Sequence, residues 1–182
     1  MSERSTVVLV DEQDKFIATE DKLVAHQQGL LHRAFSVMLY RYVDGELQFL
    51  LQKRAKTKYH CGGLWTNTCC SHPAENQNVI DSALARLKEE LVDIDVKNIN
   101  LKNIGNFIYR AEFDNGLTEH EYDHVLIGEY NGMPNGFNKN EIDQLSWVSV
   151  AVLNIDVAQN SHKYTPWFTK VLTFCLESLK VH

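Results

Sequence analysis

The sequence predicts an α+β fold in which helices pack against a mixed β-sheet. Segments with the two-residue alternation of strands recur along most of the 182 residues, and two segments have the spacing of amphipathic helices. No repeat, low-complexity tract or Pro/Gly/Ser-rich linker divides the chain, whose length fits one domain. Because one helix is central in the sequence and the other is terminal, these observations favour an α+β sandwich.

The first half of the chain is predicted to consist mainly of strands. Asp44-Gly45 is a strong hairpin signal between two of them, and a short helix at 21–27 follows the first hairpin. A basic loop at 55–63 precedes the last of these strands. The predicted strands cover 6–12, 15–20, 33–43, 46–54 and 65–72.

The clearest predicted helix is NVIDSALARLKEEL at 78–91. Asn78 followed by Asp81 resembles a capping box at its start. The sequence TPWFTKVLTFCLESLK at 165–180 predicts a second amphipathic helix, with Thr165 as N-cap and Pro166 in the first turn. One face of the first helix carries Ile80, Ala83, Leu84, Leu87 and Leu91. Further strands are predicted at 99–113, 117–130 and 141–150.

The overall composition argues against nucleic-acid and membrane partners. The net charge is −6, and no block rich in lysine or arginine is present. No apolar run approaches the ~20 residues of a membrane-spanning helix, and the N-terminus lacks the plan of a signal peptide. We therefore expect a cytoplasmic protein. In that compartment Cys61, Cys69, Cys70 and Cys175 are expected to be free thiols or ligands rather than disulfides.

Two adjacent cysteines stand in the segment GLWTNTCCSHP at 63–73. If 65–72 is a strand, Thr68, Cys70 and His72 share one face and Cys69 points to the other. Cys69 is then expected to fill the core, as buried cysteines commonly do. For Cys70, the pattern alone leaves a core role and a functional role equally open.

A run of acidic and histidine residues forms the second constellation, TEHEYDH at 118–124. Strand alternation places Glu119, Glu121 and Asp123 on one face. Three carboxylates on one face repel one another unless a cation or water lies among them. This pattern fits either a solvated edge strand or a metal site. The histidines that could add nitrogen ligands to such a site are His26, His32 and His72.

Charged residues on the central helix and the basic loop are open to two interpretations. Arg86 and Glu90 are four residues apart, which fits a surface ion pair worth ~0.3–0.5 kcal/mol or a carboxylate offered to Mg²⁺. The basic residues fit either a solvated loop or a site for a diphosphate. These basic residues are Lys53, Arg54, Lys56 and Lys58.

Taken together, these segments resemble the type I isopentenyl-diphosphate isomerases. The resemblance runs from Lys22 to the C-terminal helix, nearly the whole chain. It implies a Nudix-like α/β/α sandwich, with residues 1–182 forming one domain whose N-terminal segment binds metal. The helix segment ALARLKEELVD lacks the full pyrophosphatase signature, which argues against hydrolysis. The segments that carry the resemblance are HRAFSVMLY, QKRAKTKY, GLWTNTCCSHP, ALARLKEEL, EHEYDHVL and TPW, in this order.

The resemblance implies a role for each matching residue. The catalytic residues that it implies are Cys70, Glu121, Tyr109 and Trp167. The implied ligands of a divalent metal, Zn²⁺ or Mn²⁺, are His26, His32, His72, Glu119 and Glu121. A Mg²⁺ on the substrate diphosphate is expected to be held by Glu90 and the backbone carbonyl of Cys70. The implied substrate-binding residues are Lys22, Arg54, Lys58, Arg86 and Trp65.

The expected reaction moves a double bond by one carbon, from isopentenyl to dimethylallyl diphosphate. Such a shift needs one proton to arrive and another to leave, which an acid and a base on opposite sides of the substrate can do. In this direction Glu121, aided by Tyr109, is expected to deliver the proton and Cys70 to remove one. The expected partner is the small isoprenoid diphosphate, bound by a monomer, with no nucleic acid or membrane involved.

Three alternatives remain open from the residues. A Nudix hydrolase acting on a nucleotide or other diphosphate would share the fold and the Mg²⁺, but it would not need Cys70. A metal-binding domain without catalysis would not need the acid, the base and the cations together. A cysteine hydrolase would need His72 to activate Cys70, and no orienting third group is evident in the sequence.

Overall fold

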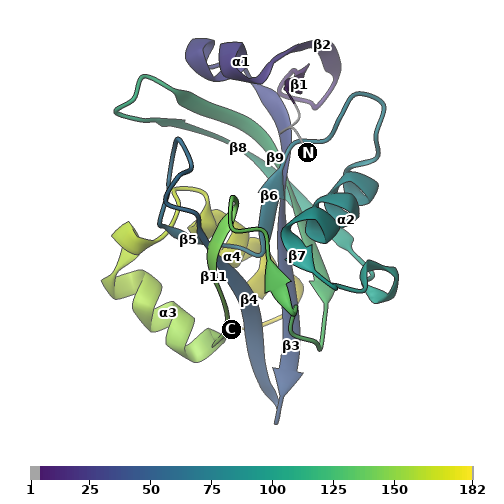
Figure 1. Ribbon diagram of the computed structural model, residues 1–182, viewed down its shortest axis with the longest axis vertical. Coiled ribbons are helices and arrows are strands. Elements are labelled where there is room, and N and C mark those ends of the chain that lie inside the picture. The colour runs from purple at the N-terminus through teal and green to yellow at the C-terminus, as the bar shows by residue number, and fades with distance from the viewer. Residues whose placement is uncertain (1–4, 182) are drawn as a thin grey trace.

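A mixed β-sheet runs through the middle of the protein, with helices against both of its faces (Figure 1). The computed structural model describes residues 5–181. The main path of the sheet is β11-β4-β3-β1-β2, with β5 paired to β4, β6 to β3, and β9 to both β3 and β8. Its strands are β1 (Thr6–Val10), β2 (Phe16–Asp21), β3 (His32–Val43), β4 (Glu46–Arg54), β5 (Trp65–Thr66), β6 (Cys69–Ser71), β8 (Lys102–Glu112), β9 (Thr118–Glu129) and β11 (Ile142–Ser149).

Short elements and helices complete the described part of the chain. A separate pair is formed by β7 (Leu91–Val92) and β10 (Gly136–Phe137). The helices are α1 (Lys22–Gln28), α2 (Val79–Glu90), α3 (Val150–Gln159) and α4 (Phe168–Ser178), with 3₁₀ turns at η1 (Val96–Asn98) and η2 (Ser161–Lys163). Within residues 5–181, no helix combines the length and the apolar character needed to cross a bilayer.

The alternation of side chains along the strands builds one core on each face of the sheet. On β3, Phe35 and Val37 pack with Leu87 of α2, whereas Met38 points to the other face and packs with Phe168 of α4. Each of these side chains is fully buried, which stabilises the fold by roughly 1.5–3 kcal/mol per large aliphatic or aromatic residue. The expected α/β/α sandwich is therefore confirmed, with α2 on one side and α4 on the other (Figure 1).

The strand that carries the acidic run lies inside the sheet. β9 pairs in parallel with β3 and antiparallel with β8, so both of its edges are occupied. Its acidic segment therefore cannot be a solvated edge strand, which corrects one of the two interpretations drawn from the sequence.

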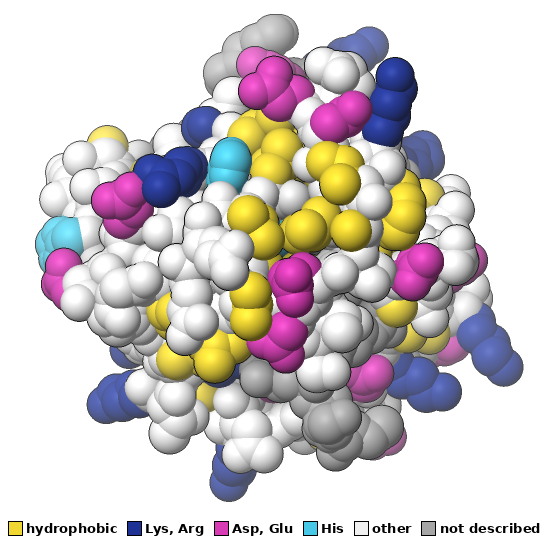
Figure 2. All heavy atoms as spheres, turned by 90° about the horizontal axis from the view of Figure 1, so that it is seen from above, with side chains coloured by type: hydrophobic (Ala, Val, Ile, Leu, Met, Phe, Trp, Pro, Cys, Tyr) yellow, Lys and Arg dark blue, Asp and Glu magenta, His cyan; other side chains and the backbone are white. Residues whose placement is uncertain are grey.

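The helix α1 and the hairpin of β1 and β2 cap one end of the sheet (Figure 1). Asp21 caps α1 by accepting hydrogen bonds from the backbone N–H groups of Leu23 and Val24, and Gly29 ends it with a left-handed φ of 63°. From above, this end shows hydrophobic side chains gathered beside acidic ones (Figure 2). The exposed hydrophobic residues of β2 and α1 are Phe16, Ile17 and Leu23.

The segment predicted as one strand at 65–72 is instead broken into β5 and β6. The side chains of Asn67 and Thr68 replace the strand ladder at the break. The Asn67 amide donates to the carbonyl of Val37 at 3.0 Å, and the Thr68 hydroxyl donates to that of Leu50 at 2.5 Å. Side-chain hydrogen bonds of this kind compete with regular backbone pairing. The break thus anchors the cysteine pair to the central strands from both sides.

Two further predictions about helices need correction. Helix α4 begins at Phe168 rather than after Thr165, and Trp167 occupies the N-cap position. The Thr165 hydroxyl instead forms a hydrogen bond with that of Thr66 at 2.9 Å, because both are buried side by side. Helix α3, capped by Ser149, was not expected from the sequence. By contrast, the predicted cap of α2 is confirmed, since Asn78 accepts from the N–H groups of Ile80 and Asp81.

Candidate active site and metal centre

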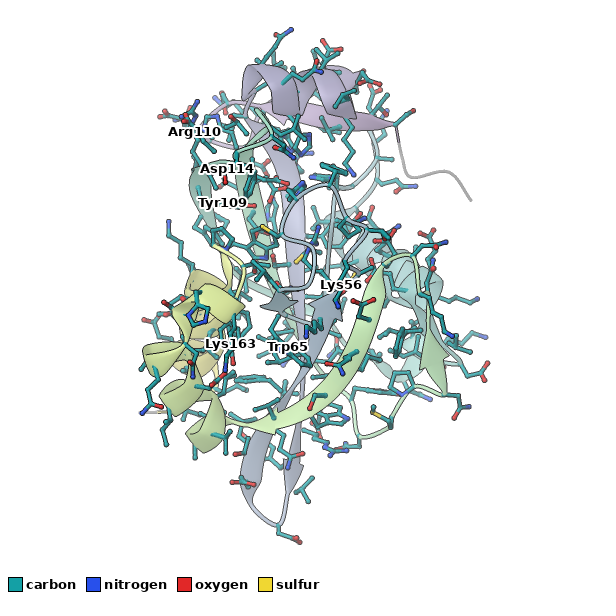
Figure 3. The ribbon with its side chains drawn as sticks, turned by 60° about the vertical axis from the view of Figure 1, so that its left-hand side comes forward. Lys56, Trp65, Tyr109, Arg110, Asp114 and Lys163 are labelled. Carbon is teal, nitrogen blue, oxygen red and sulfur yellow. The ribbon has the colours of Figure 1, made fainter. Side chains whose placement is uncertain are left out.

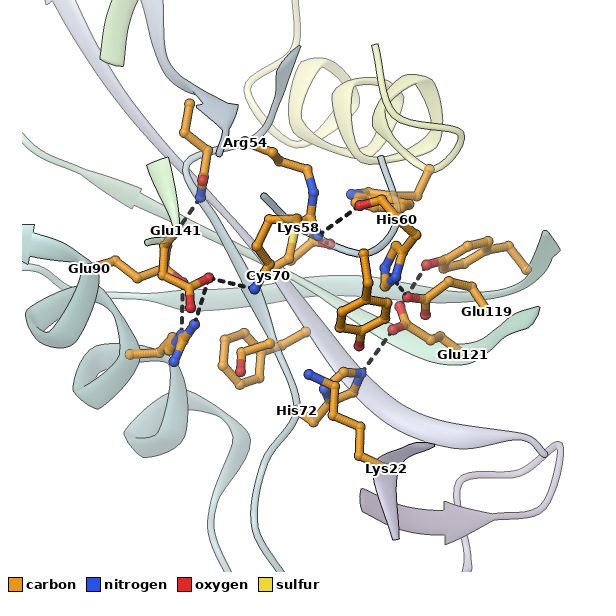
Figure 4. Close-up of a pocket in the computed structure, with 18 residues that line it drawn as sticks. Lys22, Arg54, Lys58, His60, Cys70, His72, Glu90, Glu119, Glu121 and Glu141 are labelled. Carbon is orange, nitrogen blue, oxygen red and sulfur yellow. Dashed lines mark hydrogen bonds and ion pairs between the residues drawn. The ribbon is translucent and has the colours of Figure 1, made fainter. Parts of the chain in front are cut away.

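One cavity at the end of the sheet brings most of the predicted site residues together (Figure 4). They come from segments that are distant in sequence, from the start of α1 to the start of α4. Figure 4 shows Glu90 and Glu141 on one side, Glu119 and Glu121 on the other, and Cys70 between them. The predicted residues that line the cavity are Lys22, Arg54, Lys58, Cys70, His72, Arg86, Glu90, Tyr109, Glu119, Glu121 and Trp167.

Strand alternation explains why the acidic side chains of β9 share this cavity. Glu119, Glu121 and Asp123 point to the same face as Val125, which packs in the α4 core. All three carboxylates are buried, with 3 %, 8 % and 1 % of their surface exposed. Burial raises the pKa of Asp123 well above its ordinary value, and the nearby charge of Glu121 adds to the effect. Such a cluster requires positive charge or shared protons to be stable.

Three histidines supply nitrogen atoms next to these carboxylates. Ligand atoms of His26, His32, His72 and Glu119 all lie within 4.8 Å of one another. The carboxylate of Glu121 joins them, since its Oε1 lies 3.0 Å from Nε2 of His72 and 3.7 Å from Nε2 of His32. The structure thus brings all five predicted metal ligands into one group.

Backbone contacts orient two of the histidines for metal binding. Nδ1 of His26 lies 2.5 Å from the carbonyl of Lys22, and Nδ1 of His32 lies 2.8 Å from that of Leu30. A carbonyl only accepts hydrogen bonds, so each Nδ1 carries the proton and each Nε2 offers a lone pair. These two Nε2 atoms and Oε2 of Glu119 are buried without a hydrogen-bond partner. Unpaired nitrogen and oxygen donors that converge in this way fit a divalent metal such as Zn²⁺ or Mn²⁺.

Glu121 presents its two oxygens to different partners. Oε1 faces the histidines, whereas Oε2 accepts a hydrogen bond of 2.8 Å from the hydroxyl of Tyr109. Tyr109 and Glu121 are direct partners in the antiparallel pairing of β8 with β9. Burial and the charge of Glu121 raise the pKa of Tyr109 well above its ordinary value, so the hydroxyl stays a donor. One carboxylate oxygen can therefore face a metal while the other faces the cavity.

The two adjacent cysteines have different environments. Cys69 is fully buried with Leu87 of α2 in the core on the opposite face, as the alternation predicted. The sulfur of Cys70 lies 3.1 Å from the amide nitrogen of Asn67 and 3.6 Å from the hydroxyl of Ser36. Burial raises the pKa of the Cys70 thiol to about 12, and the hydrogen bonds from these neighbours lower it only in part. Cys70 is thus the cysteine that reaches the cavity.

His72 does not serve the cysteine in the way a hydrolase dyad would require. Its Nε2 forms a hydrogen bond with Glu121 at 3.0 Å. Burial lowers the pKa of His72 to about 4, so its imidazole is neutral near pH 7. A neutral imidazole directed at a buried carboxylate suits a metal ligand better than a base for Cys70.

Charged groups from three segments meet at the other side of the cavity. Nε of Arg86 donates to Glu90 at 2.7 Å, and its Nη2 lies 3.1 Å from Glu141. Nζ of Lys58 lies 2.9 Å from the same Glu141 oxygen. Glu90 is only 2 % exposed, so the interpretation as a surface ion pair is wrong. Burial raises the pKa of Glu90, and Arg86 opposes this effect.

The aromatic residues near the site differ in position. Trp167 is buried, its ring centre lies 5.9 Å from that of Tyr109, and the guanidinium of Arg54 lies 5.7 Å from it. Trp65, which was also expected in the pocket, packs against the α4 core, and its backbone bridges to Tyr164. Figure 3 shows Trp65 well apart from Tyr109. Trp65 is not among the described residues that line the cavity, and its role in substrate binding stays a prediction.

Several residues of the site were not assigned to it from the sequence. Asn67, Ser36 and Glu141 contact predicted residues. Asn67 and Ser36 lie within segments that carry the resemblance, but no role was assigned to them, and no motif includes Glu141. His60 lies two residues after Lys58, and its Nε2 contacts Oε1 of the Glu119 carboxylate. Its place in the basic loop was the only signal, since no spacing rule connects it to β9.

Comparison with known proteins agrees with this fold. Residues 30–168 match the NUDIX domain family. A protein from Deinococcus radiodurans has a TM-score of 0.65 at 16 % identity, covering 85 % of this chain and 90 % of its own. The Ap4A hydrolase of C. elegans has a TM-score of 0.58 at 15 % identity, covering 82 % and 98 %. The chain therefore belongs to the Nudix family.

Sequence relatives narrow the family further. An isopentenyl-diphosphate Delta-isomerase from Photobacterium profundum is 43 % identical over 173 residues, which is 95 % of each chain. A protein of the same name from Aliivibrio fischeri (strain MJ11) is 46 % identical over 165 residues, 91 % of each chain. Within the Nudix family, this chain belongs with the isopentenyl-diphosphate Delta-isomerases.

Proposed function

We propose that this protein interconverts isopentenyl and dimethylallyl diphosphate by protonating one carbon and deprotonating another. The observation that carries the proposal is the shared cavity of Cys70 and the Tyr109–Glu121 pair. These groups come from different strands, so they can act on a substrate from two directions. Cations at one side of the same cavity give the diphosphate a place to bind.

Glu121 and Tyr109 are assigned to proton delivery. In the forward direction the proton goes from the Glu121 carboxyl to the terminal carbon of the double bond. The Tyr109 hydroxyl, which donates to Oε2 at 2.8 Å, stabilises the carboxylate that remains. When bound by the histidines, a divalent metal withdraws charge from Glu121 and makes its protonated form a stronger acid.

Cys70 is assigned to proton removal. Its thiolate takes a proton from the carbon next to the developing cation, and the double bond forms there. Burial keeps the resting thiol protonated, with its pKa raised to about 12, while Ser36, Arg54 and Asn67 partly favour the thiolate. In the reverse direction the two groups exchange roles, because each ends a turnover in the state that the other direction needs.

The diphosphate is assigned to the cationic side of the cavity. Lys22, Arg54, Lys58 and Arg86 all line it and can neutralise the phosphate oxygens. Glu90, together with the carbonyl of Cys70, is assigned to a Mg²⁺ that accompanies the diphosphate. When its charge is neutralised and its position is fixed, the diphosphate anchors the substrate and does not act as a leaving group.

Trp167 is assigned to the developing positive charge. Its ring is buried beside Tyr109, so water is excluded on that side. An electron-rich ring face stabilises a nearby cation by ~2 kcal/mol or more when the site is dry. The same side chain also packs at the start of α4, and the two roles are compatible.

The proposal is tested by proton NMR of isopentenyl diphosphate with the protein, Mg²⁺ and Mn²⁺ in D₂O. We expect dimethylallyl diphosphate that carries deuterium, and no product with Cys70→Ala. Release of phosphate with an intact double bond would instead identify a hydrolase, the activity of some Nudix relatives in fold. No change of either kind after metal reconstitution would contradict the proposed substrate.

A further inference from the structure

We propose that His60 is a positioning residue of the metal centre, which holds the carboxylate of Glu119 in place beside the metal ligands. The inference rests on the metal site of the proposed function. It adds a residue to the five ligands assigned above. His60 lies on the loop between β4 and β5, which contains none of those five ligands.

The contact between His60 and Glu119 is buried and directed. The side chains of His60 and Glu119 are 7 % and 4 % exposed, and Nε2 of His60 contacts Oε1 of Glu119. The same oxygen lies 3.4 Å from Nε2 of His26. The other oxygen, Oε2, is buried without a hydrogen-bond partner. His60 therefore holds the carboxylate of Glu119 by the oxygen that lies beside the predicted ligand His26, and the second oxygen has no hydrogen-bond partner.

Aromatic rings fix the orientation of the His60 imidazole. It stacks on Phe113 with ring centres 5.1 Å apart and an angle of 22° between the planes. Tyr59 meets it edge-on at 4.5 Å, and the ring of His26 lies 6.0 Å away on a ligand helix. A side chain held on several sides cannot turn away, so it fixes the rotamer of Glu119. Such outer partners of a metal ligand commonly contribute 10–100-fold to metal affinity.

The geometry favours an outer role for His60 over a direct ligand. The four side chains whose ligand atoms converge within 4.8 Å are His26, His32, His72 and Glu119. Nε2 of His60 is directed instead at Oε1 of Glu119, which belongs to one of these four side chains. His60 therefore contacts a predicted metal ligand rather than joining the group.

His60 also links the two halves of the site. Its backbone carbonyl accepts a hydrogen bond of 3.4 Å from Nη2 of Arg54, and Lys58 lies two residues before it. Both cations are assigned to the diphosphate. The loop that positions the metal ligand Glu119 is therefore the loop that presents a cation to the substrate.

The test compares three variants of the full chain by Mn²⁺ affinity, measured as free Mn²⁺ by electron paramagnetic resonance. His60→Phe keeps the ring stack but removes the donor, and we expect affinity to fall 10–100-fold. His60→Gln keeps an N–H donor and is expected to restore a large part of the loss. His162→Phe changes an exposed histidine of η2 in the same way and is expected to bind like the unchanged protein. Thermal unfolding of the metal-free proteins serves as the fold control.

Two outcomes would overturn the inference. Equal Mn²⁺ affinity of His60→Phe and the unchanged protein would leave His60 a packing residue only. Loss of one histidine nitrogen coupling from bound Mn²⁺ in electron spin-echo spectra of His60→Phe would make His60 a ligand. If the Phe variant does not fold, His60→Leu and His60→Gln, which match in size, give the same comparison. Metal affinity is measured without substrate, so a failed isomerase assay leaves this result independent.

Discussion

His32 and Glu121 occupy the same position on the neighbouring parallel strands β3 and β9, with Nε2 of one 3.7 Å from Oε1 of the other. The register between these two strands therefore places two of the predicted metal ligands next to each other. Because β9 also pairs with β8, the same carboxylate receives the Tyr109 hydroxyl from its other neighbour. The metal side and the acid side of Glu121 are therefore fixed by strand pairing rather than by loops.

Removal of His32 should remove most of the metal-dependent stabilisation. At a free Mn²⁺ concentration 100 times its Kd, binding to the folded state adds about 2.7 kcal/mol to the free energy of unfolding. His32→Leu is expected to lose most of this increment. Its metal-free Tm is expected to fall modestly, because the change removes the hydrogen bond from His32 to the carbonyl of Leu30. Thermal unfolding with and without Mn²⁺ measures both quantities. An undiminished Mn²⁺ increment would place the metal elsewhere.

Tyr109→Phe should slow the reaction without weakening substrate binding. The change removes only the hydroxyl that donates to Oε2 of Glu121. We expect kcat to fall roughly 10²-fold, since the hydroxyl assists a general acid, with KM little changed. Tyr122→Phe is the matched control, because Tyr122 lies on the opposite face of β9. A rise in KM with unchanged kcat would show that Tyr109 serves binding instead.

The two adjacent cysteines should separate activity from stability. Cys70→Ser is expected to remove activity with little change in Tm, because Cys70 reaches the cavity. Cys69→Ala is expected to keep activity but to lower the free energy of unfolding by roughly 1–2 kcal/mol, since it leaves a void in the α2 core. Chemical denaturation and the D₂O assay on both variants give the four numbers required. The reverse pattern would exchange the roles of the two residues.

The Cys70 thiol should react slowly at neutral pH in the metal-free protein. Its pKa is raised to about 12 because burial disfavours the thiolate. At pH 8 the thiolate fraction is then roughly 1 in 10⁴, and it rises tenfold per pH unit. Iodoacetamide labelling of Cys70, followed by peptide mass spectrometry, should therefore accelerate up to the highest pH at which the fold persists. A rate that levels off below pH 9 would contradict a buried, protonated thiol.

Arg86 should be needed for stability as well as for the diphosphate. Its removal leaves the buried carboxylate of Glu90 without its charge partner, which typically costs roughly 3–5 kcal/mol. We expect Arg86→Leu to show this loss and Arg86→Leu combined with Glu90→Gln to recover much of it. Urea unfolding of the two variants and of Glu90→Gln alone completes the cycle. If the second substitution recovers nothing, the cost comes from lost packing of the Arg86 side chain.

The sequence determined the order of the strands along the chain, the amphipathic helix α2 and the face on which each residue of β9 points. It did so because period-two and period-3.6 patterns are local, so they can be read from consecutive residues without knowing which segments pair with one another. Through its resemblance it also indicated the residues that converge, from His26 to Trp167. The alternation that separates Cys69 from Cys70 is of the same kind, and the structure confirms it.

The tertiary structure alone decided which strands are neighbours and what the loops reach. It placed β9 inside the sheet, so that carboxylates open to two interpretations became buried groups that face three histidines. It broke the predicted strand at Asn67, and it brought His60 and Glu141 into contact with charged side chains that are distant in sequence. These features depend on contacts between segments that are distant in sequence, and such contacts produce no periodic pattern in the sequence.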